Sequence, residues 1–281
     1  MAIDRVAGGA AFGWVIVWAI RSAIATGRKQ MQRVVKQQRV GLLVPSSNST
    51  QEPEFAATLP SSVSLHVTRL GLASVDPEST LKIVAELEKE ARKLADADVD
   101  VILLAATAPS TRMGKGYDAQ LIQRIHDATG KRATTAATAM IAAMGAYQAR
   151  RVALAGPWSS QTNQQVTDFL TSHGIEVLTQ EAAEISRNND IGRMPPQTAI
   201  ELGLKADRPD ADVLFLACGN WWTLPIIEEL EAKVRKPVLT TNNVAIWQVL
   251  KMLGGHSSVP GFGRLLREMP DVPAMVSEKA A

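Results

Sequence analysis

The sequence predicts an α/β protein made of two pseudo-symmetric, Rossmann-like halves. Each half is expected to be a parallel sheet flanked by helices, with the functional site in the cleft between them. Apolar, β-rich runs alternate along the chain with helical patterns, as they do in βαβ units. The runs are continuously apolar, which indicates strands that are buried on both faces of a sheet. Short sequences also recur in the same order in the two halves of the chain.

Seven runs are interpreted as strands: Val40–Val44, Val63–Val67, Val99–Ala105, Val152–Ala155, Glu176–Leu178, Val213–Ala217 and Val238–Thr240. Helical stretches lie between these runs. The stretch Thr80–Ala97 has its apolar residues at helical spacing, namely Leu81, Val84, Leu87, Ala91 and Leu94.

The internal repeat predicts the division into halves. RVGLLVPSSN is followed by RVALAGPWSS at an offset of 151 − 39 = 112, and DVILLAA by DVLFLAC at 212 − 100 = 112. A third pair, RATTAATA and VLTTNNVA, has an offset of 238 − 132 = 106, which indicates a shortened loop. Residues 38–147 together with about 242–270 are therefore assigned to the first half, and residues 148–241 to the second.

Residues 1–37 are expected to be an N-terminal extension outside the fold. The apolar run Val6–Ile20 is shorter than the roughly 20 residues that a membrane span needs. Met31 is an alternative start, because MQRVVKQQRVGLLV leads directly into the first strand. A weak membrane or export element is the other interpretation of this segment.

Composition narrows the class of protein. The chain has 281 residues, of which 46% are hydrophobic and 21% charged, with a net charge of +2. No stripe of Lys and Arg with interleaved aromatic residues follows the first forty residues, so nucleic-acid binding has little support. A single cysteine cannot form an internal disulfide, which favours a cytoplasmic location.

Several common kinds of site lack their motifs. The four histidines, His66, His126, His173 and His256, have no metal-ligand spacing, so no metal is expected. The sequence contains neither a GxxxxGK[ST] phosphate loop nor a GxGxxG after the first strand. It also lacks the GxSxG elbow of serine hydrolases.

Four loops are expected to line the cleft, because ligands bind outside the carboxyl ends of parallel strands. They are Pro45–Ser49, Ala106–Ser110, Pro157–Ser160 and Cys218–Trp222. In this arrangement Cys218 and Ala106 face the ligand from opposite sides. Trp158, Trp221 and Trp222 either wall an apolar pocket or belong to the core.

Cys218, in DVLFLACGNWWT, has two interpretations. Free cysteine is among the residues most often buried in cores. Its place at the end of a strand, before a helix that starts near Thr223–Pro225, favours a catalytic thiol, and a helix N-terminus is expected to lower its pKa. The loops PSSNST and PWSSQTN also lead into helices. Their Ser and Asn residues act as N-caps, present free N–H groups to a carboxylate, or do both.

The chain resembles the Asp/Glu racemase superfamily, in its maleate isomerase and arylmalonate decarboxylase branch. The resemblance covers about residues 39–268. It rests on GLLVPSSNST, on the strand that ends at Ala106-Thr107, on LACGNWWTL, on KPVLTTNNVAIWQVLKMLGG and on PGFGRLL. It implies two α/β halves, a site between them and no cofactor.

The resemblance also assigns roles. Typical members carry one catalytic cysteine in each half; Cys218 matches the second, and Ala106 occupies the place of the first. Two-base racemisation and covalent cis–trans isomerisation are therefore in doubt. Arylmalonate decarboxylases share this pattern, with one thiol that protonates an enediolate from one side.

In the decarboxylase interpretation an oxyanion hole holds the remaining carboxylate. Its candidate donors are Ser46, Ser47, Thr107 and the Gly219 N–H. The chain departs from the decarboxylases at Ala108 and at Trp158, where a hydroxyl and a tyrosine are usual. Asn48 and Asn220 are more similar to the isomerases.

Three functions follow from these observations. The leading hypothesis is cofactor-independent decarboxylation of a substituted (aryl)malonate, with Cys218 as the acid. The alternatives are a maleate isomerase or racemase-like enzyme and a non-catalytic carboxylate binder. The expected partner is a small mono- or dicarboxylate, and a homo-oligomer is compatible with the sequence.

Overall fold

The computed structural model describes residues 38–72, 82–255 and 257–272. By its contacts the chain divides between Gln37 and Gln38, and the expectation for residues 1–37 falls outside the described residues. Within the described part of the chain, no helix has both the length and the apolar character that a membrane crossing requires.

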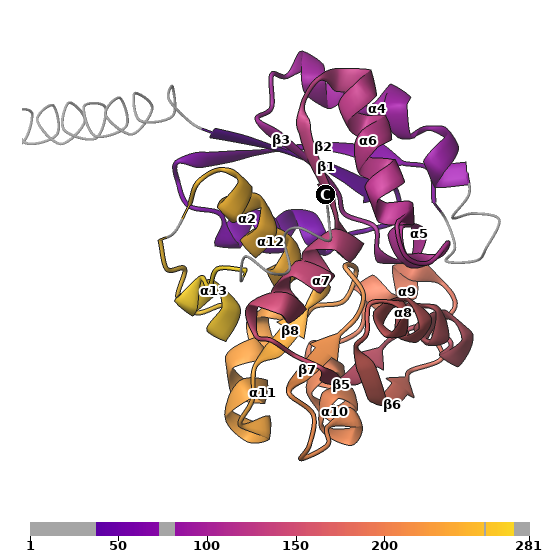
Figure 1. Cartoon of the computed structure of the whole chain (residues 1–281), viewed down its shortest axis with the longest axis vertical. Helices are drawn as coiled ribbons and strands as arrows, with labels where there is room; N and C mark the ends of the chain where they lie inside the picture. The colour runs from indigo at the N-terminus through magenta and orange to yellow at the C-terminus, as the bar shows by residue number, and fades with distance from the viewer. Residues whose placement is uncertain (1–37, 73–81, 256, 273–281) are drawn as a thin grey trace, which may run out of the picture. The chain divides into compact units, whose positions relative to one another are not determined.

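Two four-stranded parallel sheets form the framework (Figure 1). The first has the order β2-β1-β3-β4, from β1 (Gln38–Pro45), β2 (Val63–Leu70), β3 (Val101–Leu104) and β4 (Arg132–Thr135). The second has the order β6-β5-β7-β8, from β5 (Arg151–Gly156), β6 (Glu176–Ala182), β7 (Val213–Leu216) and β8 (Val238–Thr240). The same order in both sheets confirms the predicted pair of α/β halves.

The register of the strands repeats as well. Val40 pairs with Val101 between β1 and β3, and Val152 pairs with Val213 between β5 and β7. The equivalent residues of the two sheets are therefore separated by the same number of positions in the chain, 152 − 40 = 112 and 213 − 101 = 112. The next three pairs along each pair of strands keep this offset. The repeat detected in the sequence is thus a repeat of backbone pairing.

The third repeat needs a correction. Leu104 pairs with Thr135, and Leu216 pairs with Thr240. The equivalent positions are therefore 240 − 135 = 105 residues apart, not 106. Strand β4 was also missing from the predicted strands, because its sequence RATT is short and largely polar.

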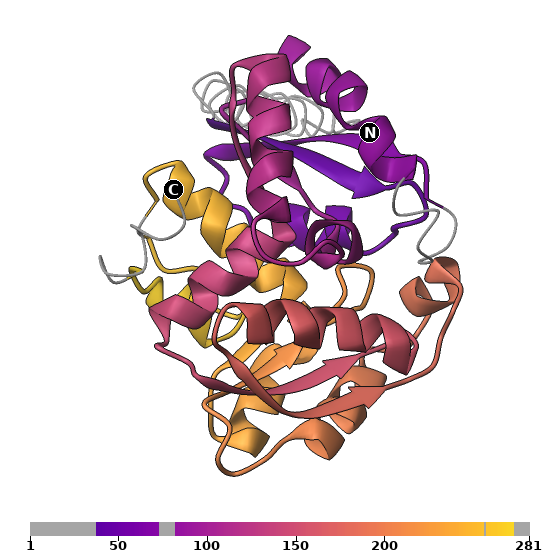
Figure 2. The same ribbon diagram turned by 45° about the vertical axis from the view of Figure 1, so that its right-hand side comes forward.

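Helices cover both faces of each sheet (Figures 1 and 2). On the first sheet, α4 and α6 pack on the outer face, whereas α2, α7 and α12 lie toward the second sheet. On the second sheet, α8 packs on one face and α10 and α11 on the other. These helices are α2 (Gln51–Thr58), α4 (Leu87–Asp96), α6 (Tyr117–Thr129), α7 (Ala136–Ala146), α8 (Ser160–Ser172), α10 (Gln197–Ala206), α11 (Ile227–Val234) and α12 (Thr241–Met252).

Shorter helices complete the fold: α5 (Thr107–Thr111), α9 (Asn188–Gly192), the 3-10 turn η1 (Leu224–Ile226) and α13 (Arg264–Glu268). The helix predicted over Thr80–Ala97 is not continuous in its described part, because a turn at Glu86 precedes α4.

The two halves share one core. On the first sheet, Leu43 and Leu104 pack outward against α4 and α6. Leu42 and Leu103 point to the other face, into a core that continues through α7 and α12 to the second sheet. Helix α12 follows the last strand of the second sheet but packs on α7 and α2 of the first half. Its N-terminus therefore lies between the halves, beside the ends of the strands.

The N-terminus of α12 is closed by a capping box. The Thr240 hydroxyl accepts the Asn243 N–H at 3.1 Å, and Asn243 Oδ1 accepts the Thr240 N–H at 2.7 Å. We expect Thr240→Ala to lower the free energy of unfolding by about 1 kcal/mol, since an N-cap hydroxyl is worth about that much. Urea unfolding measures this change. Thr240→Ser keeps the hydroxyl and is the control; an equal loss in both variants would contradict the role of the cap.

Candidate active site

A small cavity lies where strands of both sheets end. Its walls come from the segments after β1, β3, β5 and β7, joined by Leu72 and Asn188, and its volume is about 30 Å³. After β1 the chain continues toward one edge of the first sheet and after β3 toward the other edge, and β5 and β7 do the same in the second sheet. Parallel sheets bind ligands at such points, where the strand order reverses. The cavity is lined by Pro45, Asn48, Leu72, Ala105, Ala106, Thr107, Ala108, Pro109, Trp158, Asn188, Cys218, Gly219 and Asn220.

Most of the site residues predicted from sequence line this cavity: Asn48, Ala106, Thr107, Trp158, Cys218, Gly219 and Asn220. Ser46 and Ser47 do not. Their hydroxyls donate to the Leu72 carbonyl oxygen at 3.3 and 2.5 Å, so they hold the Leu72 segment in place without lining the cavity themselves. Leu72 and Asn188 were missed, because they follow β2 and β6, edge strands of the two sheets, whose loops were not among the four predicted to line the cleft.

The Cys218 side chain is almost fully buried, with 3% of its surface exposed. Its φ of +120° lies in a region that residues with a Cβ rarely adopt. The Cys218 N–H donates to Thr241 Oγ1 at 3.0 Å, and the sulfur accepts the Asn220 N–H at 3.3 Å. The thiol is therefore held at the cavity wall by a backbone that the second half and α12 keep in place.

The thiol is neutral at rest. Burial raises the pKa of Cys218 to about 12, against smaller opposing effects of the Asn220 N–H and the Trp158 indole. The expectation of a lowered pKa was wrong, because desolvation of the thiolate outweighs the nearby N–H groups. The sulfur therefore carries a proton that it can give away, rather than a charge that can attack or abstract.

Helix N-termini near the cavity are mostly occupied by the protein itself. At the start of α2, Asn48 Oδ1 accepts the N–H groups of Thr50 and Gln51. At the start of α8, Ser159 caps the first turn and Glu184 accepts another N–H. The N-cap interpretation therefore holds for Asn48 and Ser159, whose contacts take up several of these N–H groups. Helix α5 differs, because no side chain caps it.

Gly219 supplies a free donor beside the thiol. Its N–H has no acceptor among the described residues, unlike those of Cys218 and Asn220. A Cβ at this position would lie 2.3 Å from Gln51 Nε2, closer than real contacts allow. Any larger residue at this position would therefore require the Gln51 side chain to move.

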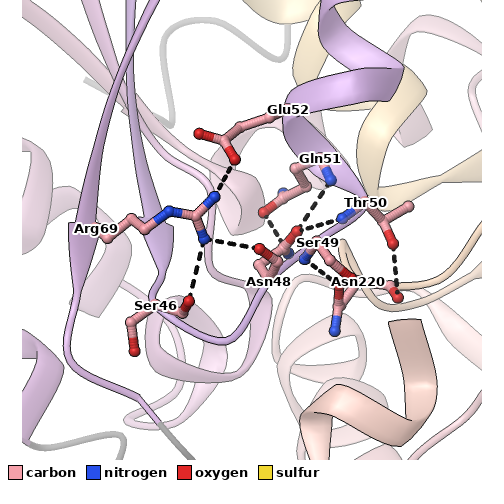
Figure 3. Close-up of polar contacts among 8 residues, drawn as sticks. All are labelled: Ser46, Asn48, Ser49, Thr50, Gln51, Glu52, Arg69 and Asn220. Atoms are coloured by element: carbon pink, nitrogen blue, oxygen red, sulfur yellow. Dashed lines mark hydrogen bonds and ion pairs between the residues drawn. The ribbon is translucent and has the colours of Figure 1, made fainter. Parts of the chain in front are cut away.

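Figure 3 shows how the loop after β1 is fixed. Arg69, near the end of β2, donates from Nη1 to the carbonyl oxygens of Ser46 at 3.1 Å and Asn48 at 2.8 Å. The same guanidinium pairs with Glu52 on α2. One side chain thus ties together the strand, the loop and the helix.

Asn220 joins the two halves across the cavity. Its Oδ1 accepts the Ser49 N–H at 2.8 Å, and its carbonyl oxygen accepts the Thr50 hydroxyl at 3.2 Å (Figure 3). Its Nδ2 donates to the Asn188 carbonyl oxygen at 2.7 Å. Both side-chain atoms of Asn220 thus bind residues of other segments, and these contacts fix the shape of the cavity.

Glu54 is a buried carboxyl behind the Cys218 segment, with 3% of its surface exposed. Its Oε1 accepts the N–H groups of Thr223 and Leu224, both at 3.0 Å, and its Oε2 accepts Asn242 Nδ2 at 2.6 Å. Burial raises the pKa of Glu54 to about 7, although these hydrogen bonds oppose the shift. Glu54 thereby occupies the N-terminus of η1, the helix start that was expected to lower the pKa of Cys218.

The raised pKa of Glu54 predicts a dependence of stability on pH. The folded pKa of about 7 exceeds the unfolded value of 4.5, so the contribution of Glu54 to stability is complete below pH 4.5 and is lost as the pH rises through 7. The loss corresponds to about 3 kcal/mol. Urea unfolding between pH 5 and 8 measures it, and Glu54→Gln should remove this slope. An unchanged slope in the variant would assign the pH dependence to other groups.

Within residues 38–72, 82–255 and 257–272, no three His, Cys, Asp or Glu side chains gather closely enough to hold a metal ion. The donors around the cavity are backbone amides, hydroxyls, carboxamides and one indole. Such groups suit a small anion.

Comparison with known proteins decides the family. The family model described as arylmalonate decarboxylase matches residues 40–266. This chain belongs to the arylmalonate decarboxylase family. The match spans both sheets and every segment that lines the cavity, and it agrees with the resemblance inferred from sequence.

Curated relatives of this family member include two kinds of enzyme. A maleate isomerase from Pseudomonas putida is 32% identical over 241 residues, covering 81% of this chain and 96% of the relative. An arylmalonate decarboxylase from Bordetella bronchiseptica is 29% identical over 232 residues, covering 82% and 96%. Among solved structures, a maleate isomerase from Pseudomonas putida S16 with maleate superposes with a TM-score of 0.80 at 30% identity, covering 83% of this chain and 98% of that chain.

Proposed function

We propose that this protein decarboxylates a small, substituted malonate without a cofactor, and that Cys218 is the proton donor. The observation that carries the proposal is a neutral, buried thiol at the cavity. At the equivalent position, the first half of the protein contributes Ala106 to the lining instead of a second reactive group. A reaction that starts without a base suits this arrangement, because no thiolate is present at neutral pH to begin one.

The steps balance with one thiol. The bond between the α-carbon and one carboxylate breaks, carbon dioxide leaves, and the electron pair remains as an enediolate. Cys218 Sγ–H then protonates the α-carbon, which gives the monocarboxylate and a thiolate. Because its pKa lies far above neutral, the thiolate regains a proton from water before the next cycle.

Two donors lie beside the thiol. The Gly219 N–H has no hydrogen-bond acceptor among the described residues, and the Trp158 indole N–H interacts with the Cys218 sulfur but has no other acceptor among them. Thr241 accepts the Cys218 N–H, and its own hydroxyl lies 3.3 Å from that of Thr107. When the Thr241 hydroxyl is the donor of this hydrogen bond, the proton of the Thr107 hydroxyl is not used in it and is free to bind the substrate. Donors placed before charge develops stabilise an enediolate strongly.

The opposite wall is apolar and holds the group that leaves. It is lined by Leu72, Ala106, Ala108 and Pro109. A charged carboxylate beside these side chains loses its hydration, whereas the neutral carbon dioxide that it becomes needs none, so the apolar lining favours loss of the carboxylate.

The first test is proton NMR of the purified protein with phenylmalonate, methyl-phenylmalonate and maleate in D2O. We expect a monodeuterated arylacetate or one enantiomer of deuterated arylpropionate. Cys218→Ala should lower the rate by about 10²–10⁴-fold, the usual contribution of a positioned acid. A racemic product, or full activity in the variant, would overturn the proposal.

Trp158→Phe tests the indole donor separately. The variant keeps an aromatic wall but loses the N–H, and we expect kcat to fall by about 10²–10³-fold, as on removal of one oxyanion donor. Trp247→Phe is the matched control, because its indole donates to the Pro270 carbonyl oxygen at 3.2 Å and does not line the cavity. Equal kcat values for the two variants would remove Trp158 from the oxyanion hole.

A maleate isomerase is the second candidate, favoured by the names of relatives such as the Pseudomonas putida enzyme and by Asn48 and Asn220 at the cavity. Fumarate in the maleate tube would establish it and would mean that isomerisation proceeds without a cysteine at position 106. Thermal stabilisation by these acids without turnover would instead indicate a carboxylate binder.

A further inference from the structure

We propose that Glu54 is a positioning residue that sets the backbone of the Cys218-Gly219 segment through the side-chain amide of Asn242. The inference rests on Cys218 being the reacting group of the proposed function. Asn242 Nδ2 donates at the same time to Glu54 Oε2 at 2.6 Å and to the Gly219 carbonyl oxygen at 3.2 Å. One amide group therefore links the buried carboxyl to the residue after the thiol.

The direction of the Asn242 amide depends on the proton of Glu54. As a carboxylate, Glu54 only accepts hydrogen bonds, and it faces Nδ2. A protonated Glu54 must donate through Oε2, and Asn242 Oδ1 is a buried acceptor with no partner among the described residues. Rotation of the amide by half a turn satisfies both groups, but it withdraws Nδ2 from the Gly219 carbonyl oxygen.

The Gly219 peptide has few other restraints. Its N–H has no acceptor among the described residues, and Cys218 before it has a φ of +120°. Release of the Gly219 carbonyl oxygen removes the only hydrogen bond of the Gly219 peptide among the described residues, and the strained segment is then held only through its neighbours, by the Cys218 N–H on Thr241 and by the hydrogen bonds of Asn220. Protonation of Glu54 therefore loosens the segment that carries both the thiol and the free donor.

The surroundings of Glu54 contain no counter-charge that would prevent this change. Its side-chain partners are two backbone N–H groups and one amide, and no charged residue contributes to the shift of its pKa. The pKa raised to about 7 places the change near neutral pH.

Alkylation of Cys218 by iodoacetamide, followed by intact-mass spectrometry, tests this inference without any substrate. Cys218 is the only cysteine of the chain. The alkylation rate of Cys218 should rise tenfold per pH unit above pH 8, as the thiolate fraction does, so that its logarithm is a straight line against pH. Below pH 7 the measured wild-type rate should lie several-fold above the extension of this line. A single straight line from pH 5 to 9 would overturn the proposal.

Glu54→Gln should react several-fold faster than the wild type above pH 7, match it below pH 7 and lose the break, because its amide N–H₂ cannot face Asn242 Nδ2. Glu90→Gln is the matched control, since Glu90 is also buried but pairs with Thr68 and Lys93 on the far side of the first sheet. This control should keep the wild-type break. Loss of the break in both variants would contradict the inference.

The double variant Glu54→Gln with Asn242→Asp separates positioning from stability. It restores a hydrogen bond between the two side chains but returns no donor to the Gly219 carbonyl oxygen. We expect thermal stability to recover while the fast alkylation, and kcat where decarboxylation is observed, stay as in Glu54→Gln. Recovery of the wild-type alkylation rate together with stability would reduce Glu54 to a structural role. Absence of decarboxylation would affect only the proposed function.

Discussion

The backbone of Cys218 is the constraint on which the site depends. A φ of +120° in a residue with a side chain costs about 1–3 kcal/mol, and neighbouring contacts offset that cost. Thr241 accepts the Cys218 N–H, and Gly219 packs directly against Gln51. Because these contacts come from α12 and α2, both halves must be assembled before the thiol reaches the cavity. The placement of the thiol is therefore determined by tertiary structure rather than by its own strand.

The two halves share a framework but not a chemistry. Strand pairing makes position 240 equivalent to 135, so Thr241 and Asn242 correspond to Ala136 and Ala137. The first half thus has alanine at the position of the thiol, and also at the positions of the hydroxyl and the amide that hold the Cys218 segment. The asymmetry between the halves extends from the thiol to its supports, which fits a reaction with one active face.

Sequence reasoning predicted the fold and most of the cavity wall, because repeated apolar strands and the loops after them are local signals. It did not predict that the Glu54 side chain occupies the N-terminus of η1 or that the pKa of Cys218 is raised. Glu54 and Thr223, for example, are 169 residues apart in the chain yet share a hydrogen bond. Burial of the thiol likewise depends on packing that no single segment encodes. Strand β4 escaped because RATT is too short and polar to stand out.

Equivalent strand residues of the two halves are 112 positions apart up to β7 and only 105 apart at β8. The segment between β7 and β8 is seven residues shorter than the one between β3 and β4. A shorter connection has fewer conformations to lose on folding, so the copy with the thiol closes its loop at a smaller entropic cost. If the halves descend from one duplicated unit, they have diverged in chain length as well as in side chains, and the shorter copy carries the cysteine.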